Sequence, residues 1–161
     1  MKIIYLAGGC FWGIEAYFKL FDFVIDTEVG YANGNYLNPK YEDLKIGKAT
    51  HSETLKLTYK DDTSLEEIIN TYLEVVNPYS INKQGEDVGL QYRTGIYTLE
   101  EKELEQIKEI LLKKEKEFNK GKFQIEVSKL LNYSPAEEYH QDYLDKHKDG
   151  YCHIDLSKYK K

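Results

Sequence analysis

Cys10 stands where the chain is best able to present a reactive thiol. It follows two consecutive glycines after the apolar segment 3–7, and it precedes a segment, 11–21, in which apolar residues recur at helical spacing. Because successive glycines permit a sharp turn, the sequence predicts a strand, a turn and a helix, with Cys10 at the helix N-terminus. Unpaired N–H groups and the positive end of the helix dipole favour a thiolate there. The alternative is a buried cysteine that only packs against Phe11 and Trp12.

The second cysteine, Cys152, lies near the other end of the chain. Two distant cysteines do not form the dense pattern of a disulfide-stapled secreted domain, so any pairing between them is expected to be catalytic. A length of 161 residues is typical of one domain, and we take 1–161 as that domain. Its C-terminal tail, about 148–161, is short, polar and charged, and we expect it to be mobile.

Charge and hydropathy argue against two classes of partner. The formal net charge is -6, which disfavours binding to the phosphate backbone of nucleic acid. No apolar run approaches the roughly 20 residues of a membrane helix, and the first apolar run lacks the length and the cleavage pattern of a signal peptide. The sequence therefore predicts a cytoplasmic protein with no nucleic-acid and no membrane partner.

Strand and helix signals alternate along the chain. Segments rich in β-branched and aromatic residues predict strands at 3–7, 24–31, 54–59, 92–97 and 123–131. Between 78 and 91 lies a glycine-bearing stretch with no clear period, and irregular loops of this length are often functional.

Three helices beyond the first are predicted from capping boxes, in which a serine or threonine is followed three residues later by glutamate. The boxes are Ser64 with Glu67, Thr98 with Glu101, and Ser134 with Glu137, and the helices end near residues 76, 118 and 147. The pattern predicts an α/β (α+β) two-layer sandwich with a ferredoxin-like core. Its helices pack on a mixed, mainly antiparallel sheet.

The block at 9–15, Gly-Cys-Phe-Trp-Gly-Ile-Glu, resembles the A-type peptide methionine sulfoxide reductases, and the resemblance spans nearly the whole chain. Six further blocks follow in the family's order. They are 28–32, 38–42, 51–53, 84–93, 139–141 and 150–152.

The resemblance implies reduction of the S epimer of methionine sulfoxide, free or in proteins, and hence protein repair under oxidative stress. A thiolate is the side chain best suited to attack a sulfoxide sulfur, which becomes a good electrophile once its oxygen is protonated or strongly hydrogen-bonded. The match makes Cys10 the nucleophile and Glu53 the acid that protonates this oxygen. Glu53 must then be protonated near neutral pH, which requires burial that raises its pKa.

Five further positions take their roles from the same match. The hydroxyls of Tyr41 and Tyr92 hydrogen-bond the sulfoxide oxygen, and Asp87 belongs to the polar wall of the site. Phe11 and Trp12 cup the substrate methyl group, because sulfur and methyl groups pack well against aromatic faces. Taken singly, each of these residues is more typical of ordinary packing or loop structure.

The resemblance also implies a route for recycling. It assigns Cys152 to the resolving thiol, which condenses with a sulfenic acid left on Cys10 to form a disulfide. An external dithiol, thioredoxin in the family or dithiothreitol in an assay, then reopens that disulfide. The match implies no bound cofactor or metal, and family members are commonly monomeric.

The chain departs from the family at several positions. Its tail lacks the glycine-rich extension with a further cysteine that some members carry, so the relay is expected to end at Cys152. Glu86 stands where many members carry asparagine. Its charge, beside Asp87, is expected either to raise the pKa of nearby acids or to disfavour acidic substrates.

Three other functions remain open from residue types alone. Cys10, Cys152 and the histidines are potential zinc ligands, although no Cys-x-x-Cys spacing occurs. A cysteine-dependent hydrolase needs a histidine base beside Cys10, and no histidine has such a sequence context. A non-catalytic peptide-binding domain would use the 15 tyrosines as anchors.

Overall fold

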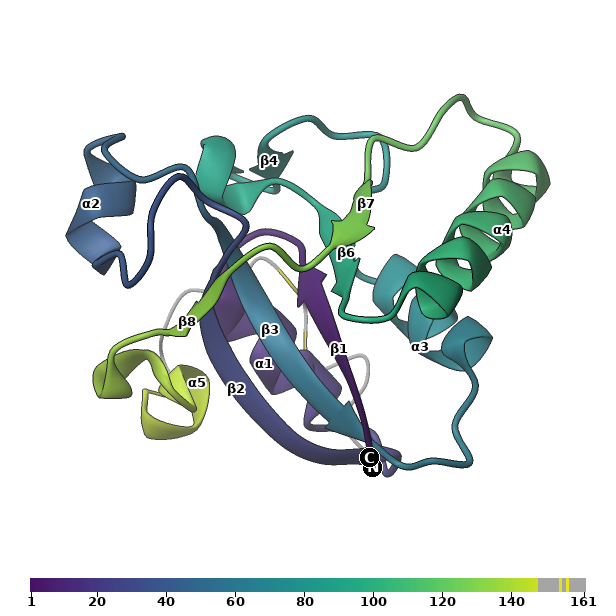
Figure 1. Cartoon of the computed structure of the whole chain (residues 1–161), viewed down its shortest axis with the longest axis horizontal. Coiled ribbons are helices and arrows are strands. Elements are labelled where there is room, and N and C mark those ends of the chain that lie inside the picture. The colour runs from purple at the N-terminus through teal and green to yellow at the C-terminus, as the bar shows by residue number, and fades with distance from the viewer. Residues whose placement is uncertain (148–153, 155, 157–161) are drawn as a thin grey trace.

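A curled β-sheet runs through the middle of the molecule (Figure 1). The computed structural model describes residues 1–147, 154 and 156. Within these residues the sheet has six strands in the order β7-β6-β1-β3-β2-β8, and every neighbouring pair is antiparallel except β6 and β7. The strands are β1 (Lys2–Ala7), β2 (Val24–Ala32), β3 (Ser52–Tyr59), β6 (Gly95–Thr98), β7 (Glu126–Lys129) and β8 (Tyr133–Pro135).

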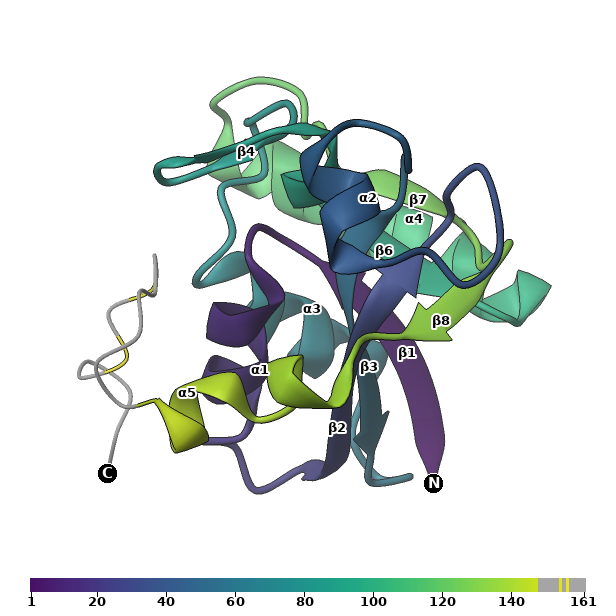
Figure 2. The ribbon, with the colours of Figure 1, turned by 90° about the vertical axis from the view of Figure 1, so that its left-hand side faces the viewer.

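The centre of the sheet has the ferredoxin-like order β6-β1-β3-β2, with α1 (Phe11–Phe18) between β1 and β2 and α3 (Leu65–Leu73) after β3. Figure 2 shows α1 and α3 on the same side of these strands. This arrangement confirms the predicted α/β sandwich with a mixed, mainly antiparallel sheet. The third long helix, α4 (Glu101–Phe118), connects β6 to the parallel strand β7.

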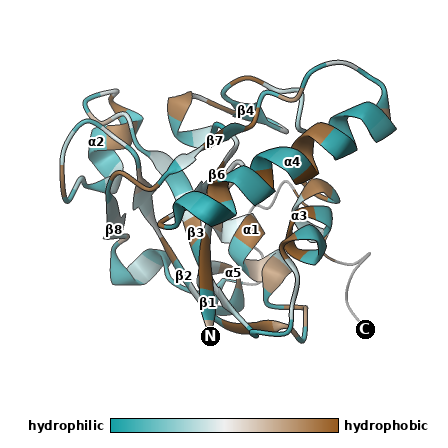
Figure 3. Cartoon of the chain, turned by 45° about the vertical axis from the view of Figure 1, so that its right-hand side comes forward, coloured by the Kyte–Doolittle hydropathy of each residue, from teal (hydrophilic) through white to brown (hydrophobic). Residues whose placement is uncertain are grey.

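The main core lies between the sheet and these helices. Strand residues such as Leu6 and Leu55 alternate towards this side, where they meet Ile14 and Phe18 of α1 and Ile68 of α3. Each such side chain contributes roughly 1.5–3 kcal/mol when it leaves water. The outward surface of α4 is largely hydrophilic (Figure 3), as expected for a helix that buries a single stripe.

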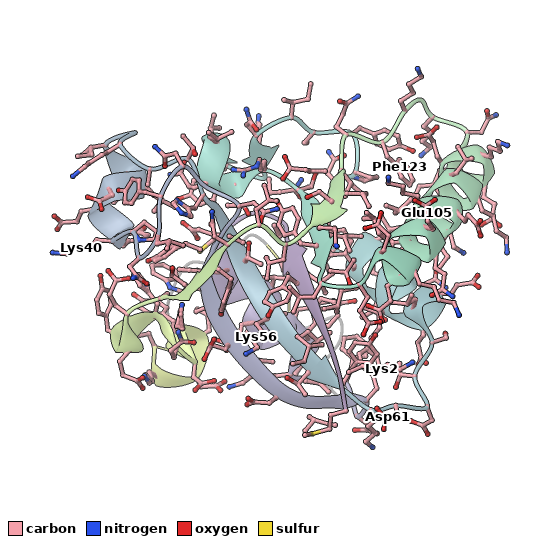
Figure 4. All side chains as sticks on the ribbon, in the orientation of Figure 1. Lys2, Lys40, Lys56, Asp61, Glu105 and Phe123 are labelled. Atoms are coloured by element: carbon pink, nitrogen blue, oxygen red, sulfur yellow. The ribbon has the colours of Figure 1, made fainter. Side chains whose placement is uncertain are left out.

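The opposite face of the sheet carries a smaller cluster formed by Tyr5, Ala7, Ala32 and Tyr97. The chain between β7 and β8 crosses this face (Figure 1), and Leu130 and Tyr133 pack on the cluster. Lys56, which lies opposite Tyr5 in the β1–β3 register, stands on the same face, turned away from α1 (Figure 4). The sheet is therefore covered fully on one side and partly on the other.

Capping was predicted correctly for α3 but not for α4. The Ser64 side chain accepts a hydrogen bond from Glu67 N (3.1 Å), which caps α3 as predicted. At α4 the N-cap residue is Glu100, and Thr98 ends β6 instead. The Thr98 hydroxyl accepts a hydrogen bond from Glu100 N (3.2 Å) and donates to Glu103 Oε1 (2.9 Å). Thr98 therefore binds the N–H of the N-cap residue from the end of the strand, and its side-chain partner is Glu103 rather than Glu101.

The helix predicted from Ser134 to about residue 147 is wrong. Residues Tyr133–Pro135 form β8, which pairs with the edge of β2, and Ala136 N donates to Val29 O (2.9 Å). A free sheet edge offers this segment more backbone hydrogen bonds than a local helix start. Only the short elements η2 (Glu138–His140) and α5 (Tyr143–Lys146) are helical here. The predicted mobile tail, with Cys152, lies outside the described residues apart from 154 and 156.

Four small elements lie near the end of the sheet where β1 finishes (Figures 1 and 2). They are α2 (Tyr41–Lys45), the strand pair β4 (Lys83–Gln84) and β5 (Asp87–Val88), and the 3₁₀ helix η1 (Leu90–Tyr92). The predicted strand at 92–97 is thus shorter than expected, because its first residue closes η1.

Candidate active site

Cys10 is the N-cap residue of α1, as the sequence predicted. The turn that leads to it places Gly9 at a φ of 81°, a left-handed conformation that favours glycine. Gly8 is needed for a different reason, because a Cβ there would lie 2.7 Å from a methyl group of Val76, three residues after α3 ends. Cys10 is only 8% exposed, so its thiol is largely shielded from solvent.

Glu53 lies beside this helix start although it is far away in the sequence. It extends from β3, it is 1% exposed, and its Oε1 accepts a hydrogen bond from Phe11 N (3.2 Å). The other oxygen, Oε2, has no hydrogen-bond partner among the described residues. Burial raises the pKa of Glu53 to about 8. The charge of Asp87 adds to this rise, whereas the hydrogen bond from Phe11 N acts to lower the pKa. The carboxyl is therefore largely protonated at neutral pH, the state that the resemblance implies.

This burial predicts how stability depends on pH. The pKa of Glu53 is about 8 in the folded protein and near 4.5 for a free side chain, so the folded state holds this proton more tightly. Between these two pH values the unfolded chain releases the proton while the folded protein keeps it. Each rise of one pH unit therefore shifts the folding equilibrium about tenfold towards the unfolded state. Glu53→Gln removes this term. Urea unfolding at about pH 5 and about pH 8 should show the variant gaining stability over the parent protein as pH rises. A constant difference would contradict the buried, protonated state.

Tyr41 and Tyr92 face the same two groups. Burial first, then the charges of Glu53 and Cys10, raise the pKa of Tyr41 to about 12. Burial, Glu53, Tyr41 and Cys10 raise the pKa of Tyr92 still further. Tyr92 is also fixed through its carbonyl, which accepts a hydrogen bond from Gly9 N (3.3 Å). Both hydroxyls therefore stay protonated at neutral pH and are able to donate hydrogen bonds.

Asp87 of β5 contributes electrostatically to this group. Its charge acts to raise the pKa values of Glu53, Tyr41 and Tyr92. Burial and then Glu86 raise the pKa of Asp87 itself. The direction of this effect of Glu86 agrees with the one expected from the sequence. The hairpin that carries Asp87 lies in the irregular stretch 78–91, which the sequence marked as functional.

His140 is a site residue to which sequence reasoning gave no role in the reaction, although it lies in the family-matching block 139–141 and was considered as a zinc ligand and as a hydrolase base. It is 1% exposed, and its ring contacts Phe11, Trp12, Tyr41 and Tyr139 at centroid distances of 5.3, 5.8, 4.5 and 4.1 Å. Trp12 Nε1 donates to His140 Nδ1 (3.0 Å). Because an indole N–H can only donate, the imidazole proton lies on Nε2. Burial lowers the pKa of His140 and keeps the ring neutral.

Glu137, which was expected to close a capping box, instead joins two elements of the site. Its Oε1 accepts a hydrogen bond from the hydroxyl of Tyr31 (2.7 Å), the residue opposite Glu53 in the β2–β3 register. Its Oε2 accepts from Tyr41 N (3.2 Å), which begins α2. The Phe11 ring packs on Tyr31 at 5.7 Å. The structure thus brings together seven of the eight sequence-predicted site residues, and the eighth, Cys152, lies outside the described residues.

Two features are absent from the described part of the chain. No group of three or more His, Cys, Asp or Glu side chains there is arranged to hold a metal ion. No helix in that part is both long enough and apolar enough to cross a membrane.

Comparison with known proteins identifies the family. A family model described as peptide methionine sulfoxide reductase matches residues 2–161. The chain belongs to this family. It is 51% identical over 154 residues to peptide methionine sulfoxide reductase MsrA of Lachnoclostridium phytofermentans, a match that covers 95% of this chain and 92% of that relative. It is 48% identical over 162 residues to the MsrA of Ureaplasma urealyticum, covering 100% of this chain and 98% of the relative.

A solved structure extends the likeness to three dimensions. The reduced form of Mxr1 from Saccharomyces cerevisiae superposes with a TM-score of 0.88 at 32% identity, covering 94% of this chain and 88% of that one. The resemblance to peptide methionine sulfoxide reductases is thereby confirmed, and the cysteine-dependent hydrolase is not supported. A thiolate–imidazolium pair of the peptidase type needs a charged histidine, whereas burial lowers the pKa values of His51 and His140.

Proposed function

We propose that this protein reduces the S epimer of methionine sulfoxide, free or in oxidised proteins, through Cys10 and Glu53. Membership of the family supports the reaction, and one geometric observation supports the two residues. A thiol at the N-terminus of α1 lies beside a buried carboxyl group whose pKa is near 8 and whose Oε1 is held by the next residue of the same helix. A nucleophile and an acid are thus available together at neutral pH.

The first step transfers one oxygen atom. The Cys10 thiolate donates an electron pair to the sulfoxide sulfur while Glu53 gives its proton to the sulfoxide oxygen. The bond formed between the two sulfur atoms and the sulfur–oxygen bond of the substrate then both break in a rearrangement that moves the hydroxyl group to the Cys10 sulfur. The products are methionine, a sulfenic acid on Cys10 and a Glu53 carboxylate. The sulfoxide is reduced by two electrons and the thiol is oxidised by two.

The residues around this pair orient the substrate. Tyr41 and Tyr92 donate hydrogen bonds to the sulfoxide oxygen, because both hydroxyls remain protonated and both lie within the electrostatic reach of Cys10 and Glu53. Phe11 and Trp12 hold the methyl group, with contacts of roughly 0.3–1.5 kcal/mol each. Asp87 forms part of the polar wall.

Recycling uses the second thiol. Cys152 attacks the sulfenic sulfur, water leaves with the proton of the thiol, and a Cys10–Cys152 disulfide results. A dithiol protein such as thioredoxin, or dithiothreitol in an assay, reduces this disulfide by thiol exchange. Mxr1 from Saccharomyces cerevisiae has been solved in complex with Trx2. We infer a thioredoxin-like partner for this protein too, with oxidised proteins as substrates. The proposed enzyme is a cytoplasmic monomer with a single domain over 1–161, and it repairs oxidative damage without a bound cofactor.

An epimer-resolved assay tests the proposal. With dithiothreitol, the purified protein is expected to reduce the S epimer of a methionine sulfoxide substrate and leave the R epimer unchanged. Cys10→Ser is expected to abolish this activity, because a hydroxyl at this position is not ionised at neutral pH and cannot accept the oxygen. Separation of the two epimers by chromatography after reaction gives the answer. Equal consumption of both epimers, or an active Cys10→Ser variant, would falsify the assignment.

A further inference from the structure

The side chain of Glu137, just before η2, accepts hydrogen bonds from three donors. Its Oε1 accepts from the hydroxyl of Tyr31 (2.7 Å), and its Oε2 accepts from Tyr41 N (3.2 Å) and from the hydroxyl of Tyr139 (3.4 Å). Burial acts to raise the pKa of Glu137, but the hydrogen bonds that it accepts outweigh burial and hold this pKa below its usual value. At neutral pH the group is therefore a carboxylate, which has only acceptors to offer.

The backbone that carries Glu137 is fixed to β2 on both sides. Before it, Ala136 N donates to Val29 O (2.9 Å). After it, the Gln141 side chain donates to Val29 O (2.8 Å) and accepts from Val29 N (2.9 Å). Both contacts attach the segment 136–141 to the same residue of the sheet. The carboxylate therefore extends from backbone that is anchored to the sheet.

Tyr41 begins α2, a short helix at the edge of the fold (Figure 1). Its five residues are too few to form a stable helix alone. Leu44 anchors the helix through burial in the main core, but apolar packing is not directional. The ring of Tyr41 packs on His140, with centroids 4.5 Å apart. The hydrogen bond from Tyr41 N to Glu137 adds a directional, charge-assisted contact at the residue where the helix starts.

The Tyr31 hydroxyl connects the same carboxylate to the other side of the site. Tyr31 is fully buried in β2, its ring packs on Phe11, and it lies opposite Glu53 in the β2–β3 register. Burial, followed by the hydrogen bond to Glu137, raises the pKa of Tyr31, so its hydroxyl stays protonated and donates. One carboxylate thus joins the start of α2 to the strand beside the proposed acid.

We propose that Glu137 is a positioning residue for oxygen transfer: it holds Tyr41 in the orientation from which the Tyr41 hydroxyl donates to the sulfoxide oxygen. This inference rests on the proposed function, because it takes Tyr41 as that donor. Glu137 acts through Tyr41 and not on the substrate. Without the carboxylate, Tyr41 N loses its partner and the hydroxyl spends less time in the productive orientation. It then contributes less to stabilising the charge on the oxygen.

A double-mutant cycle tests this role. The rate of methionine formation in the first turnover is measured by chromatography, without reductant and at subsaturating substrate. Glu137→Leu keeps most of the side-chain volume and removes both acceptors. We expect the rate to fall about fivefold to fiftyfold, and by no more than in Tyr41→Phe, since complete loss of one positioned donor costs about 10²- to 10³-fold.

The background in which Glu137→Leu is made decides the interpretation. In Tyr41→Phe the hydroxyl is already absent, so adding Glu137→Leu should cost less than about twofold more. In Tyr92→Phe, Glu137→Leu should keep most of its effect, because the hydrogen bond of Glu137 is to Tyr41.

Two further variants check the chemistry at position 137. Glu137→Gln keeps the size and one acceptor. Tyr41 N takes that acceptor, because the Tyr31 hydroxyl is able to accept from the amide while a backbone N–H is not. This variant should restore the rate to within about threefold of the parent protein. Glu137→Ala removes the acceptors without placing apolar atoms beside Tyr41 N, and it repeats the cycle if Glu137→Leu does not fold.

The chain offers a matched control in Glu28. This residue of β2 also accepts a hydrogen bond from a tyrosine hydroxyl, that of Tyr133 (2.8 Å). Tyr133 packs on the smaller cluster on the opposite face of the sheet, whereas Cys10 belongs to the main core. Glu28→Leu should therefore leave the first-turnover rate within about twofold of the parent protein.

The possible results separate the inference from the proposed function. A parental rate in Glu137→Leu, or an equal loss on the parent and Tyr41→Phe backgrounds, would limit Glu137 to supporting the fold, and the inference would be wrong. A loss that disappears on the Tyr92→Phe background as well would make Glu137 act on the site as a whole, which also contradicts the inference. A parental rate in Tyr41→Phe alone would remove Tyr41 from the proposed reaction, and the inference with it.

Discussion

Glu53→Gln is expected to slow the reduction of methionine sulfoxide by about 10²- to 10⁴-fold at neutral pH, the range attributed to a positioned general acid. Glutamine fills the same space and is able to accept the Phe11 N–H, but it has no acidic proton to give to the sulfoxide oxygen. The measurement is the single-turnover rate of methionine formation, which excludes recycling.

Asp87→Asn is the matched control for this prediction. Asp87 influences the pKa of Glu53 but, on the proposed mechanism, does not deliver the proton. We therefore expect a clearly smaller loss of rate. In the parent protein the rate should fall as pH rises through about 8, because the carboxyl group then loses its proton. The reverse ranking of the two variants would move the acid from Glu53 to Asp87.

Cys152→Ser is expected to separate the chemical step from recycling. The variant should form one methionine per protein at the parental rate, because the first oxygen transfer needs only Cys10. Its turnover with thioredoxin should drop by about 100-fold or more, since no intramolecular thiol is present to form the disulfide that thioredoxin attacks. Turnover with dithiothreitol should suffer less, because a small dithiol is able to reach the sulfenic acid directly.

Two measurements check this prediction. Methionine quantified after a single turnover reports the first step, and NADPH oxidation in a coupled thioredoxin system reports recycling. Intact mass should show a retained oxygen in Cys152→Ser where the parent protein loses two hydrogens. Wild-type recycling in the variant would remove Cys152 from the relay.

Local patterns in the sequence were sufficient to place Cys10 at the start of a helix. Glycines after an apolar strand and a helical repeat after Cys10 predicted the turn and the helix that the structure contains. The Ser64 box was equally reliable, because cap and helix are neighbours in the chain. The Ser134 box failed because the segment pairs with the free edge of β2 instead of starting a helix. That edge lies about a hundred positions earlier in the sequence, so local patterns do not reveal it.

Long-range contacts explain the rest. Nothing in the residues around Glu53 signals burial, and its partner Phe11 lies 42 positions away. Without the family resemblance it would have passed for a surface glutamate. His140 and Glu137 carry no repeating pattern, and their roles depend on residues 128 and 96 positions away. Such residues are predictable from one sequence only when the fold that joins them is already known.

The hydrogen bond from Phe11 N to Glu53 has a final consequence for the proposed reaction. Before oxygen transfer the single anion of this pair is the sulfur atom, and afterwards it is the carboxylate. Both stand at the same positively polarised terminus of α1. The negative charge therefore moves from the sulfur to the carboxylate while it stays at the same helix terminus. The fixed backbone dipoles need little rearrangement as the reaction proceeds.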